Sequence, residues 1–239
     1  MKQQVLSSIA LLSLLSLIGC GSNSTVTREA TPDDSFVSET VEFQGLEYKT
    51  IQSDLTKQIW LDRNIGAAQV CKSATDTACY GDYFQWGRYI DGHQNSNSST
   101  TPKQIVDIDN QLNQDFIVEH SDWTIADTNT AQRAVKWSKL DGSSVCPVGF
   151  RVPTESEIRA ETAMKFLELP LAGMRSNLTG EVVLQDQSGL LWTSTSYESD
   201  TSGNQSISFL HYIRQDTPID GQSGTSPATG MPVRCIKAQ

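Results

Sequence analysis

The chain contains 239 residues, of which 28 are acidic and 18 basic, so its formal net charge at pH 7 is −10. Binding to nucleic acid or to anionic headgroups depends on clustered Lys and Arg, and this acidic composition therefore excludes both as charge-driven partners. Aromatic residues make up 8% of the chain and charged residues 19%, which is typical of a globular rather than a disordered protein.

The first twenty residues have the organisation of an export signal. Lys2 precedes an apolar segment over residues 5–18, and the small residue Gly19 stands before Cys20. The segment is shorter than the roughly 20 apolar residues that span a bilayer. Residues 17–20, with sequence LIGC, resemble the lipobox of bacterial lipoproteins, which implies cleavage before Cys20 and acyl chains on it. The alternative is an ordinary secretory peptide that happens to contain a cysteine.

These features predict three parts of the chain. We expect residues 1–19 to be the signal peptide, residues 20–40 the lipidated Cys20 with a polar, disordered tether, and residues 41–239 one large domain. Gly21, not Asp, follows Cys20, which in Gram-negative lipoproteins implies transport to the outer membrane. The expected membrane partner is thus reached through the acyl chains, and the sequence does not indicate which face of the membrane the domain occupies.

Four cysteines remain beyond Cys20, and they are Cys71, Cys79, Cys146 and Cys235. An even number in an exported chain favours two disulfides, for which sequence permits three pairings. Local spacing favours Cys71 with Cys79, which leaves Cys146 with Cys235. A metal or redox centre is the alternative, but there is no C-x-x-C pair and His is scarce, so we expect neither metal nor cofactor.

The first half of the domain is expected to open with a β-hairpin and continue into a helix. Apolar residues on either side of Gln44-Gly45 predict strands at 41–43 and 46–51, followed by another strand at 58–62. Aromatic residues and Ile at 80, 83, 84, 86 and 90 are compatible with one helical face, with Asp82 as N-cap and Gly92 as the stop. Such a stripe could stack on sugars, but core packing is the simpler interpretation.

A long polar stretch follows, from residue 94 to about 129, and we expect a surface loop with Trp123 pinned inward. Asp and Asn at 107, 109, 113 and 115 raise the question of a calcium site, since hard oxygen ligands at alternate positions can converge on one cation. The EF-hand pattern fails, because Leu112 stands where Gly is needed and Val118 where Glu is needed. A solvated acidic loop is the preferred interpretation.

The second half contains the surest helix signal. Thr154 and Glu157 form a capping box after Pro153, and apolar residues at 160, 163, 164 and 167 share one face up to Pro170. Strands are expected at 190–194, 207–213 and 233–236. Two helices followed by antiparallel strands predict an α+β fold.

Residues 146–155, with sequence CPVGFRVPTE, resemble the Fibrobacter succinogenes major paralogous domain, a family of exported bacterial proteins. The resemblance extends in order through further blocks, which lie at residues 60–66, 81–88, 91–93, 122–123, 169–175, 191–195 and 233–237. It covers the chain from about Val41 to the end. Phe150 stands where relatives often carry Tyr or Trp, and Thr193 where they often carry Ser; both departures are conservative.

This family is similar in turn to the C-type-lectin-like fold that includes formylglycine-generating enzymes. The resemblance implies a disulfide-stabilised, C-type-lectin-like domain with two main helices and short antiparallel strands, whose two ends meet and in which Cys146 is bridged to Cys235. It does not imply a reaction, because members have no well-established biochemical activity. The resemblance therefore indicates a fold and a location more than a function.

The sequence favours a binding or adhesion module over an enzyme. No G-x-S-x-G, H-E-x-x-H or P-loop motif occurs, so no catalytic residue is assigned, and a formylglycine-type oxidase is the alternative. Arg175, Trp192 and Tyr197 are the candidate ligand-binding residues, because aromatic faces stack on rings and a guanidinium offers paired donors. Core packing for Trp192 and a salt bridge for Arg175 are their alternatives. The ligand is expected to be a protein or glycan, although the Glu-Pro-Asn and Trp-Asn-Asp signatures of calcium-dependent lectins are missing.

Overall fold

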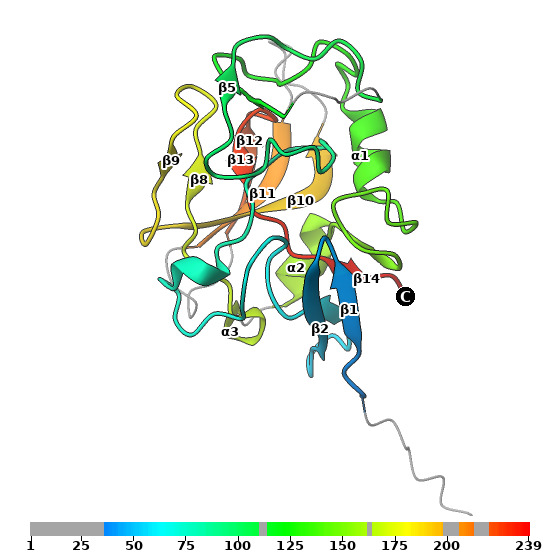
Figure 1. Ribbon diagram of the computed structural model, residues 1–239. Helices are drawn as coiled ribbons and strands as arrows, with labels where there is room; N and C mark the ends of the chain where they lie inside the picture. The colour runs from blue at the N-terminus through cyan, green and yellow to red at the C-terminus, as the bar shows by residue number, and fades with distance from the viewer. Residues whose placement is uncertain (1–35, 110–113, 162–163, 198–205, 213–219) are drawn as a thin grey trace, which may run out of the picture. The chain divides into compact units, whose positions relative to one another are not determined.

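The computed structural model describes residues 36–109, 114–161, 164–197, 206–212 and 220–239 (Figure 1). The predicted signal peptide, Cys20 and most of the tether lie outside these residues. Residues from Phe36 onward belong to one compact unit. Among the described residues, no helix combines the length and the apolar character that crossing a bilayer requires.

The N-terminal hairpin and the C-terminal strand share one sheet. Its order is β1 (Thr40–Phe43), β2 (Leu46–Gln52), β3 (Ile59–Leu61), β14 (Ile236–Lys237) and β7 (Phe150–Arg151), and all neighbours are antiparallel. The hairpin turns at Gln44-Gly45, where both residues have positive φ, as the sequence predicts. The two ends of the domain therefore meet, and Lys237 Nζ lies 2.6 Å from Glu39 Oε2.

Three further sheets complete the β structure. A four-stranded sheet has the order β4 (Phe84–Gln85), β13 (Gly230–Met231), β8 (Met174–Arg175) and β9 (Val182–Val183). A three-stranded antiparallel sheet consists of β10 (Gly189–Tyr197), β11 (Ser206–Tyr212) and β12 (Asp220–Thr225). The short strands β5 (Thr100–Thr101) and β6 (Phe116–Ile117) pair in parallel.

The expectation of an α+β, C-type-lectin-like domain with two main helices is wrong, because the described chain is mostly β. Its helical elements are short and consist of the 3-10 helix η1 (Thr77–Cys79), α1 (Ala131–Trp137), α2 (Glu155–Ala160) and α3 (Met164–Leu167). None of them exceeds seven residues, whereas β10 alone has nine. The structure is thus built mainly from antiparallel strands and irregular segments, with α1 at one side of the view in Figure 1 and α2 behind the β1–β2 hairpin.

The helix predicted around residues 80–90 does not form. Gly81 and Gly87 have φ values of +79° and +75°, which a right-handed helix cannot contain, and Phe84 and Gln85 pair with β13 as strand β4. Asp82 is consequently not an N-cap. The aromatic residues are nevertheless buried, so the core interpretation of this segment is confirmed.

The helix predicted to run towards Pro170 is divided. Thr154 and Glu157 form the predicted capping box, but α2 ends at Ala160, and the ψ of 71° at its C-cap Glu161 leaves the helical region. The buried Glu161 carboxylate accepts hydrogen bonds from Ser53 Oγ at 2.6 Å and Trp60 Nε1 at 3.1 Å, and this anchorage holds the chain out of the helix. Ala160, expected on the apolar face, is exposed, and residue 163 lies outside the described residues.

Strands β10 and β11 agree with the strands predicted at 190–194 and 207–213, except that residue 213 lies outside the described residues. The predicted last strand at 233–236 is shorter, because only Ile236–Lys237 pair as β14. The preceding residues are buried and still bonded along the first sheet, since the carbonyls of Val233 and Cys235 accept from Ile65 N and Leu61 N.

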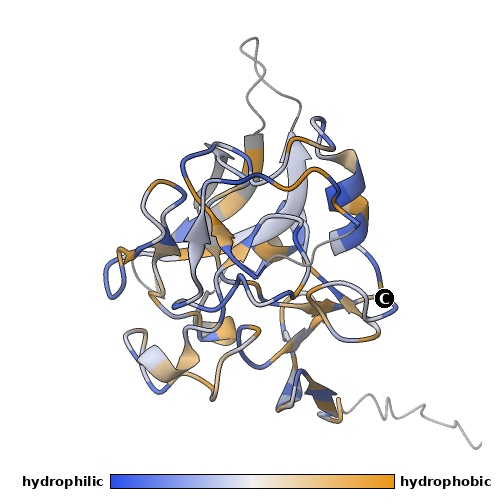
Figure 2. Cartoon of the chain, turned by 45° about the horizontal axis from the view of Figure 1, so that its top comes forward, coloured by the Kyte–Doolittle hydropathy of each residue, from blue (hydrophilic) through white to orange (hydrophobic). Residues whose placement is uncertain are grey.

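Helix α1 was not predicted from the sequence. Its charged residues are buried and an apolar residue is exposed, which is the reverse of the usual pattern. Figure 2 shows hydrophilic and hydrophobic residues interspersed along it. Arg133 and Lys136 are buried, whereas Val135 is 64% exposed. The polar faces of α1 therefore pack inward, which is possible because both cations find acceptors there.

Five tryptophans form the heart of the core, and each indole N–H has an acceptor. Those of Trp86, Trp123, Trp137 and Trp192 donate to backbone carbonyls at 2.7–3.1 Å, and that of Trp60 donates to Glu161. Trp123 is thus pinned inward, as predicted, beneath the long polar segment. These contacts connect the core to loops that have no regular structure of their own.

The two predicted disulfides are confirmed, Cys71 with Cys79 and Cys146 with Cys235. They span 8 and 89 residues of sequence. Cys146 and Cys235 are buried in the main core cluster, beside the C-terminal strand. The longer link fastens the segment before β7 to the segment before β14.

We expect removal of the longer link to destabilise the domain more. Loop-closure entropy gives about 4.5 kcal/mol for the Cys146–Cys235 disulfide and about 2.5 kcal/mol for Cys71–Cys79. Urea unfolding of the full chain, followed by tryptophan fluorescence, would compare the double variants Cys146→Ala/Cys235→Ala and Cys71→Ala/Cys79→Ala. Equal losses in the two variants would contradict this ranking.

Candidate functional site

The three predicted ligand-binding residues do not form a common surface. Trp192 in β10 is fully buried and its Nε1 donates to Phe84 O at 2.7 Å. Arg175 in β8 is also buried. Tyr197 at the end of β10 is 43% exposed and its hydroxyl donates to Glu155. Of the three, only Tyr197 is open to a ligand.

Arg175 has a structural task. Its guanidinium donates to the carbonyls of Gly180 at 2.7 Å, Asn95 at 2.8 Å and Ser98 at 2.6 Å, and it lies 4.2 Å above the Phe116 ring. Burial lowers the pKa of Arg175 to about 10. The side chain fastens two irregular segments to β8, and its donors are committed to those carbonyls.

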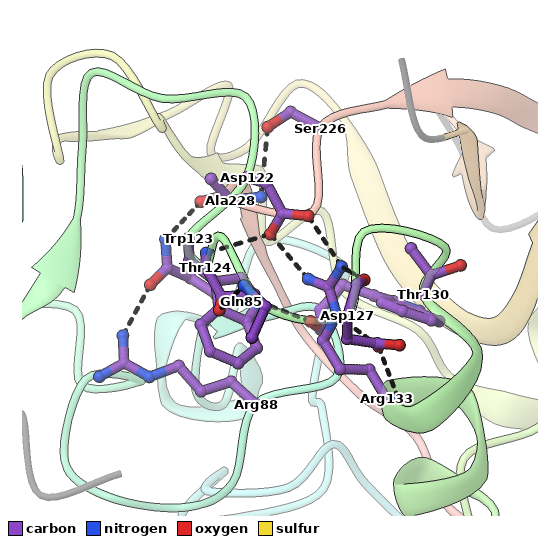
Figure 3. A network of polar contacts seen from close by, with 12 residues as sticks. Gln85, Arg88, Asp122, Trp123, Thr124, Asp127, Thr130, Arg133, Ser226 and Ala228 are labelled. Carbon is purple, nitrogen blue, oxygen red and sulfur yellow. Dashed lines mark hydrogen bonds and ion pairs between the residues drawn. The ribbon is translucent and has the colours of Figure 1, made fainter. Parts of the chain in front are cut away.

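A second buried arginine organises the polar network of Figure 3. Arg133 on α1 binds both oxygens of Asp122, at 2.7 and 2.8 Å, and Asp127 at 3.1 Å. Its guanidinium carbon lies 5.2 Å from the centroid of the Trp123 ring. This network ties α1 to the preceding loop and is satisfied internally, so it belongs to the scaffold.

We expect Arg133→Met to destabilise the protein by about 3–5 kcal/mol, because it leaves two carboxylates without their buried cation. The matched control is Arg159→Met, which removes the i,i+4 pair of a 46% exposed Arg159 side chain with Glu155 and should change stability by less than about 1 kcal/mol. Urea midpoints of the two variants measure the difference. Similar losses would show that Arg133 acts as an ordinary surface residue.

The fully buried histidine, His93, is also engaged on both ring nitrogens. Nδ1 lies 2.5 Å from Asp91 Oδ1, and Nε2 accepts from Gln85 N at 3.1 Å. Burial, assisted by the nearby Arg88, lowers the pKa of His93 to about 4. The imidazole is therefore neutral at physiological pH and has no free nitrogen with which to act as a general base.

The acidic segment considered for calcium is partly described. Asp107 accepts from Asp109 N at 2.9 Å, Asp109 pairs with Lys136 at 2.7 Å, and Asp115 accepts from Ser99. Residues 110–113 lie outside the described residues. Within the described ranges, no group of three or more His, Cys, Asp or Glu side chains is arranged to hold a metal ion.

A pocket of about 340 Å³ lies between the turn of the β1–β2 hairpin and the segments around residues 65 and 82. Ligand pockets have volumes of about 300–1,000 Å³, so this one has room for a small molecule or a single side chain. Leu46 and Ile90 supply apolar lining, and Ile65 lies at its wall but is 1% exposed. Asp82 is the charged residue among those that line it.

Two glycines bring Asp82 into the pocket. Gly66 and Gly81 both have positive φ, and Asp82 N donates to Ile65 O at 2.9 Å. A Cβ on Gly66 would lie only 2.4–2.7 Å from the atoms of the Asp82 carboxyl group, and one on Gly81 would lie 2.5 Å from Ile65 O. The absence of both side chains lets the carboxylate rest directly against the backbone of Gly66.

The Asp82 carboxylate differs from the buried acids described above. Glu161, Asp91, Asp122 and Asp127 each accept hydrogen bonds or pair with a cation. Within the part of the chain that the structure describes, the Asp82 carboxylate has no donor and no cationic partner. Burial alone raises the pKa of Asp82 to about 6. A perturbed acid in a pocket is the feature that marks functional sites, so this pocket is the candidate.

Comparisons with protein-family models, with curated proteins and with solved structures give no match for this chain. The site therefore rests on its own geometry. Sequence reasoning missed Asp82 as a site residue because it assigned that residue to a helix cap. The glycine at 81, directly before Asp82, was the available signal that this segment bends rather than coils.

We expect Asp82→Asn to stabilise the folded protein at pH 8 and to leave it unchanged at pH 4. The folded-state pKa of about 6 exceeds the ordinary value of 3.8, so the folded state prefers the protonated acid, and the penalty builds as pH rises from the ordinary pKa to about 6 and is complete above it. A shift of that size corresponds to about 3 kcal/mol, which partial solvent screening reduces to about 1–2 kcal/mol.

Thermal and urea unfolding at the two pH values would measure this change. Asp54→Asn, at an exposed turn, is the matched control and should have no effect at either pH. A loss of stability in Asp82→Asn at pH 8 would mean that the carboxylate has a stabilising partner.

Proposed function

We propose that this protein is a lipid-anchored binding protein of the bacterial envelope, held at the outer membrane by acyl chains on Cys20. Its domain acts as a non-enzymatic binding module for a protein or glycan ligand. The single observation that carries the binding role is the pocket at Asp82, where a half-buried carboxylate has no internal partner among the described residues. An acid that the fold leaves unsatisfied is available to a ligand.

The two disulfides support the extracytoplasmic part of this proposal. Disulfides persist in oxidising compartments and are rare in the cytosol. Both bonds join residues of the domain, which leaves Cys20 as the remaining cysteine in the chain. This is the residue that the lipobox resemblance assigns to acylation. The family resemblance, with its exported members, is consistent with the same location.

The bonding of the cysteines also favours a binding role over a formylglycine-type oxidase. Such an enzyme requires a reactive cysteine pair that binds copper. Here Cys146 and Cys235 are bonded to each other and buried, and Cys71 is bonded to Cys79. The buried His93 has both ring nitrogens occupied, so it is a poor candidate for acid–base catalysis.

Acylation should be visible in cells fed an alkyne analogue of palmitate. We expect the full chain to take up the label in the membrane fraction and to begin at Cys20 by mass spectrometry. The Cys20→Ala variant should lose the label and keep residues 1–19, because lipoprotein cleavage requires the modified cysteine. Asp82→Asn serves as a control that should label normally.

A thiol count and a copper titration on the purified, labelled protein distinguish the binding module from the formylglycine-type oxidase. We expect no free thiol under native conditions and no stoichiometric Cu(I) binding. An unlabelled wild-type chain with an unmodified terminus would contradict the anchor. Free, copper-binding Cys146 or Cys235 would contradict the non-enzymatic assignment.

A further inference from the structure

The chemistry of the Asp82 pocket restricts what it can hold. The partly buried aliphatic residues Leu46 and Ile90 share the lining with the amide residues Gln44, Gln94 and Asn95, while Ile65 is itself 1% exposed. No cationic side chain is among the lining residues. The pocket thus combines one negative charge with apolar walls, which disfavours an anion and favours a ligand that has both a positive charge and carbon surface.

The charged groups on the surrounding elements do not neutralise Asp82. Tyr48 on β2 uses its hydroxyl oxygen to accept from Gly66 N at 3.0 Å. Arg63 lies 4.4 Å from the Tyr48 ring centroid, and its guanidinium is bound to Asp62 at 3.0 Å and to Ala67 O. In the chain between the lining residues Ile90 and Gln94, Asp91 and His93 bind each other, and Asp91 also binds Arg88. The nearby cations are therefore committed to other acids.

We propose that this pocket binds the ammonium group of a small organic cation, with Asp82 as counter-ion and Leu46 and Ile90 against its carbon skeleton. This inference rests on the proposed binding function and names its ligand class. A divalent metal fits less well, because calcium takes six to eight oxygen ligands and magnesium an octahedral set, whereas the pocket offers one carboxylate. An ammonium ion needs one carboxylate and a few amide oxygens.

Binding of a cation is coupled to the ionisation of Asp82. The bound ammonium group favours the carboxylate, so the ligand lowers the pKa of Asp82 and displaces its proton. With a free pKa of about 6, the acid is ionised at pH 8 but only about one-tenth ionised at pH 5. An alkylammonium group, with a pKa near 10, stays charged throughout. Affinity should therefore fall about tenfold between pH 8 and pH 5.

Calorimetric titration of the full lipidated chain in a non-ionic detergent tests the proposal with matched pairs of probes. Glucosamine and N-acetylglucosamine represent an amino sugar with and without its charge. Nα-acetyl-lysine methylamide and its Nε-acetylated form represent a lysine side chain in the same way. We expect binding at pH 7, where Asp82 is mostly ionised and both amines are mostly protonated, by the charged member of one pair, with the acetylated member at least about tenfold weaker. The pair that responds identifies the source of the ammonium group.

Two variants complete the design. Asp82→Asn should lose at least about tenfold in affinity, while Asp54→Asn, an exposed acid elsewhere, should bind as the wild type does. Equal binding of charged and acetylated probes, retention of affinity in Asp82→Asn, or heat from calcium chloride but from no amine would each overturn the inference. These outcomes leave the acylation result untouched, so failure of the ligand class is distinguishable from failure of the anchor.

Discussion

The structure depends on the need to satisfy buried backbone carbonyls in segments that have little regular structure. Four arginines, Arg88, Arg133, Arg175 and Arg234, are essentially fully buried and supply many of the donors. Arg175 binds three carbonyls from the segments at 95–98 and 180, and Arg234 binds those of Leu61 and Leu167. An unsatisfied buried carbonyl costs about 1–3 kcal/mol, so a guanidinium with five donors replaces the hydrogen bonds that a longer helix or sheet would provide.

The same constraint explains why the candidate site has a free acid. The buried guanidiniums face carbonyls or their own carboxylates, as Arg88 does with Asp91 and Arg133 with Asp122 and Asp127. Asp82 lies at the edge of this arrangement, against Gly66 and beneath the hairpin turn, where no buried arginine reaches it. The buried arginines of the scaffold are therefore all occupied by acceptors within the protein. The Asp82 pocket is the place where the positive charge of a ligand fits.

Elements that depend on local sequence signals could be predicted, whereas those that depend on buried polar groups could not. The hairpin followed from apolar positions around Gln44-Gly45, the α2 start from the Thr154 and Glu157 capping box, and the disulfides from cysteine spacing. Helix α1 could not be found through periodicity, because its buried face carries Arg133 and Lys136 while Val135 points to solvent. Helix prediction from periodicity relies on polar residues facing water. That rule fails in this fold wherever a buried Arg or Lys side chain binds buried acceptors. The second predicted helix failed for a related reason, since Glu161 is held by side chains more than 100 residues away.

The site illustrates the same limit at a single residue. The segment before residue 83 contains an acid that fits a helix cap, and only the positive φ of Gly66 and Gly81 turns it into the wall of a pocket. Whether a carboxylate has a partner is a property of the folded chain. Arg63 lies over the ring of Tyr48, but its guanidinium is bound to Asp62. Above the pKa of that acid, a fold that buries it unpaired is less stable than one with a neutral side chain there, whereas a bound cation adds stability with the logarithm of its concentration divided by its dissociation constant. Aspartate at position 82 thus lowers the stability of the ligand-free protein and favours binding of a cation. This is the thermodynamic relation expected of a binding site.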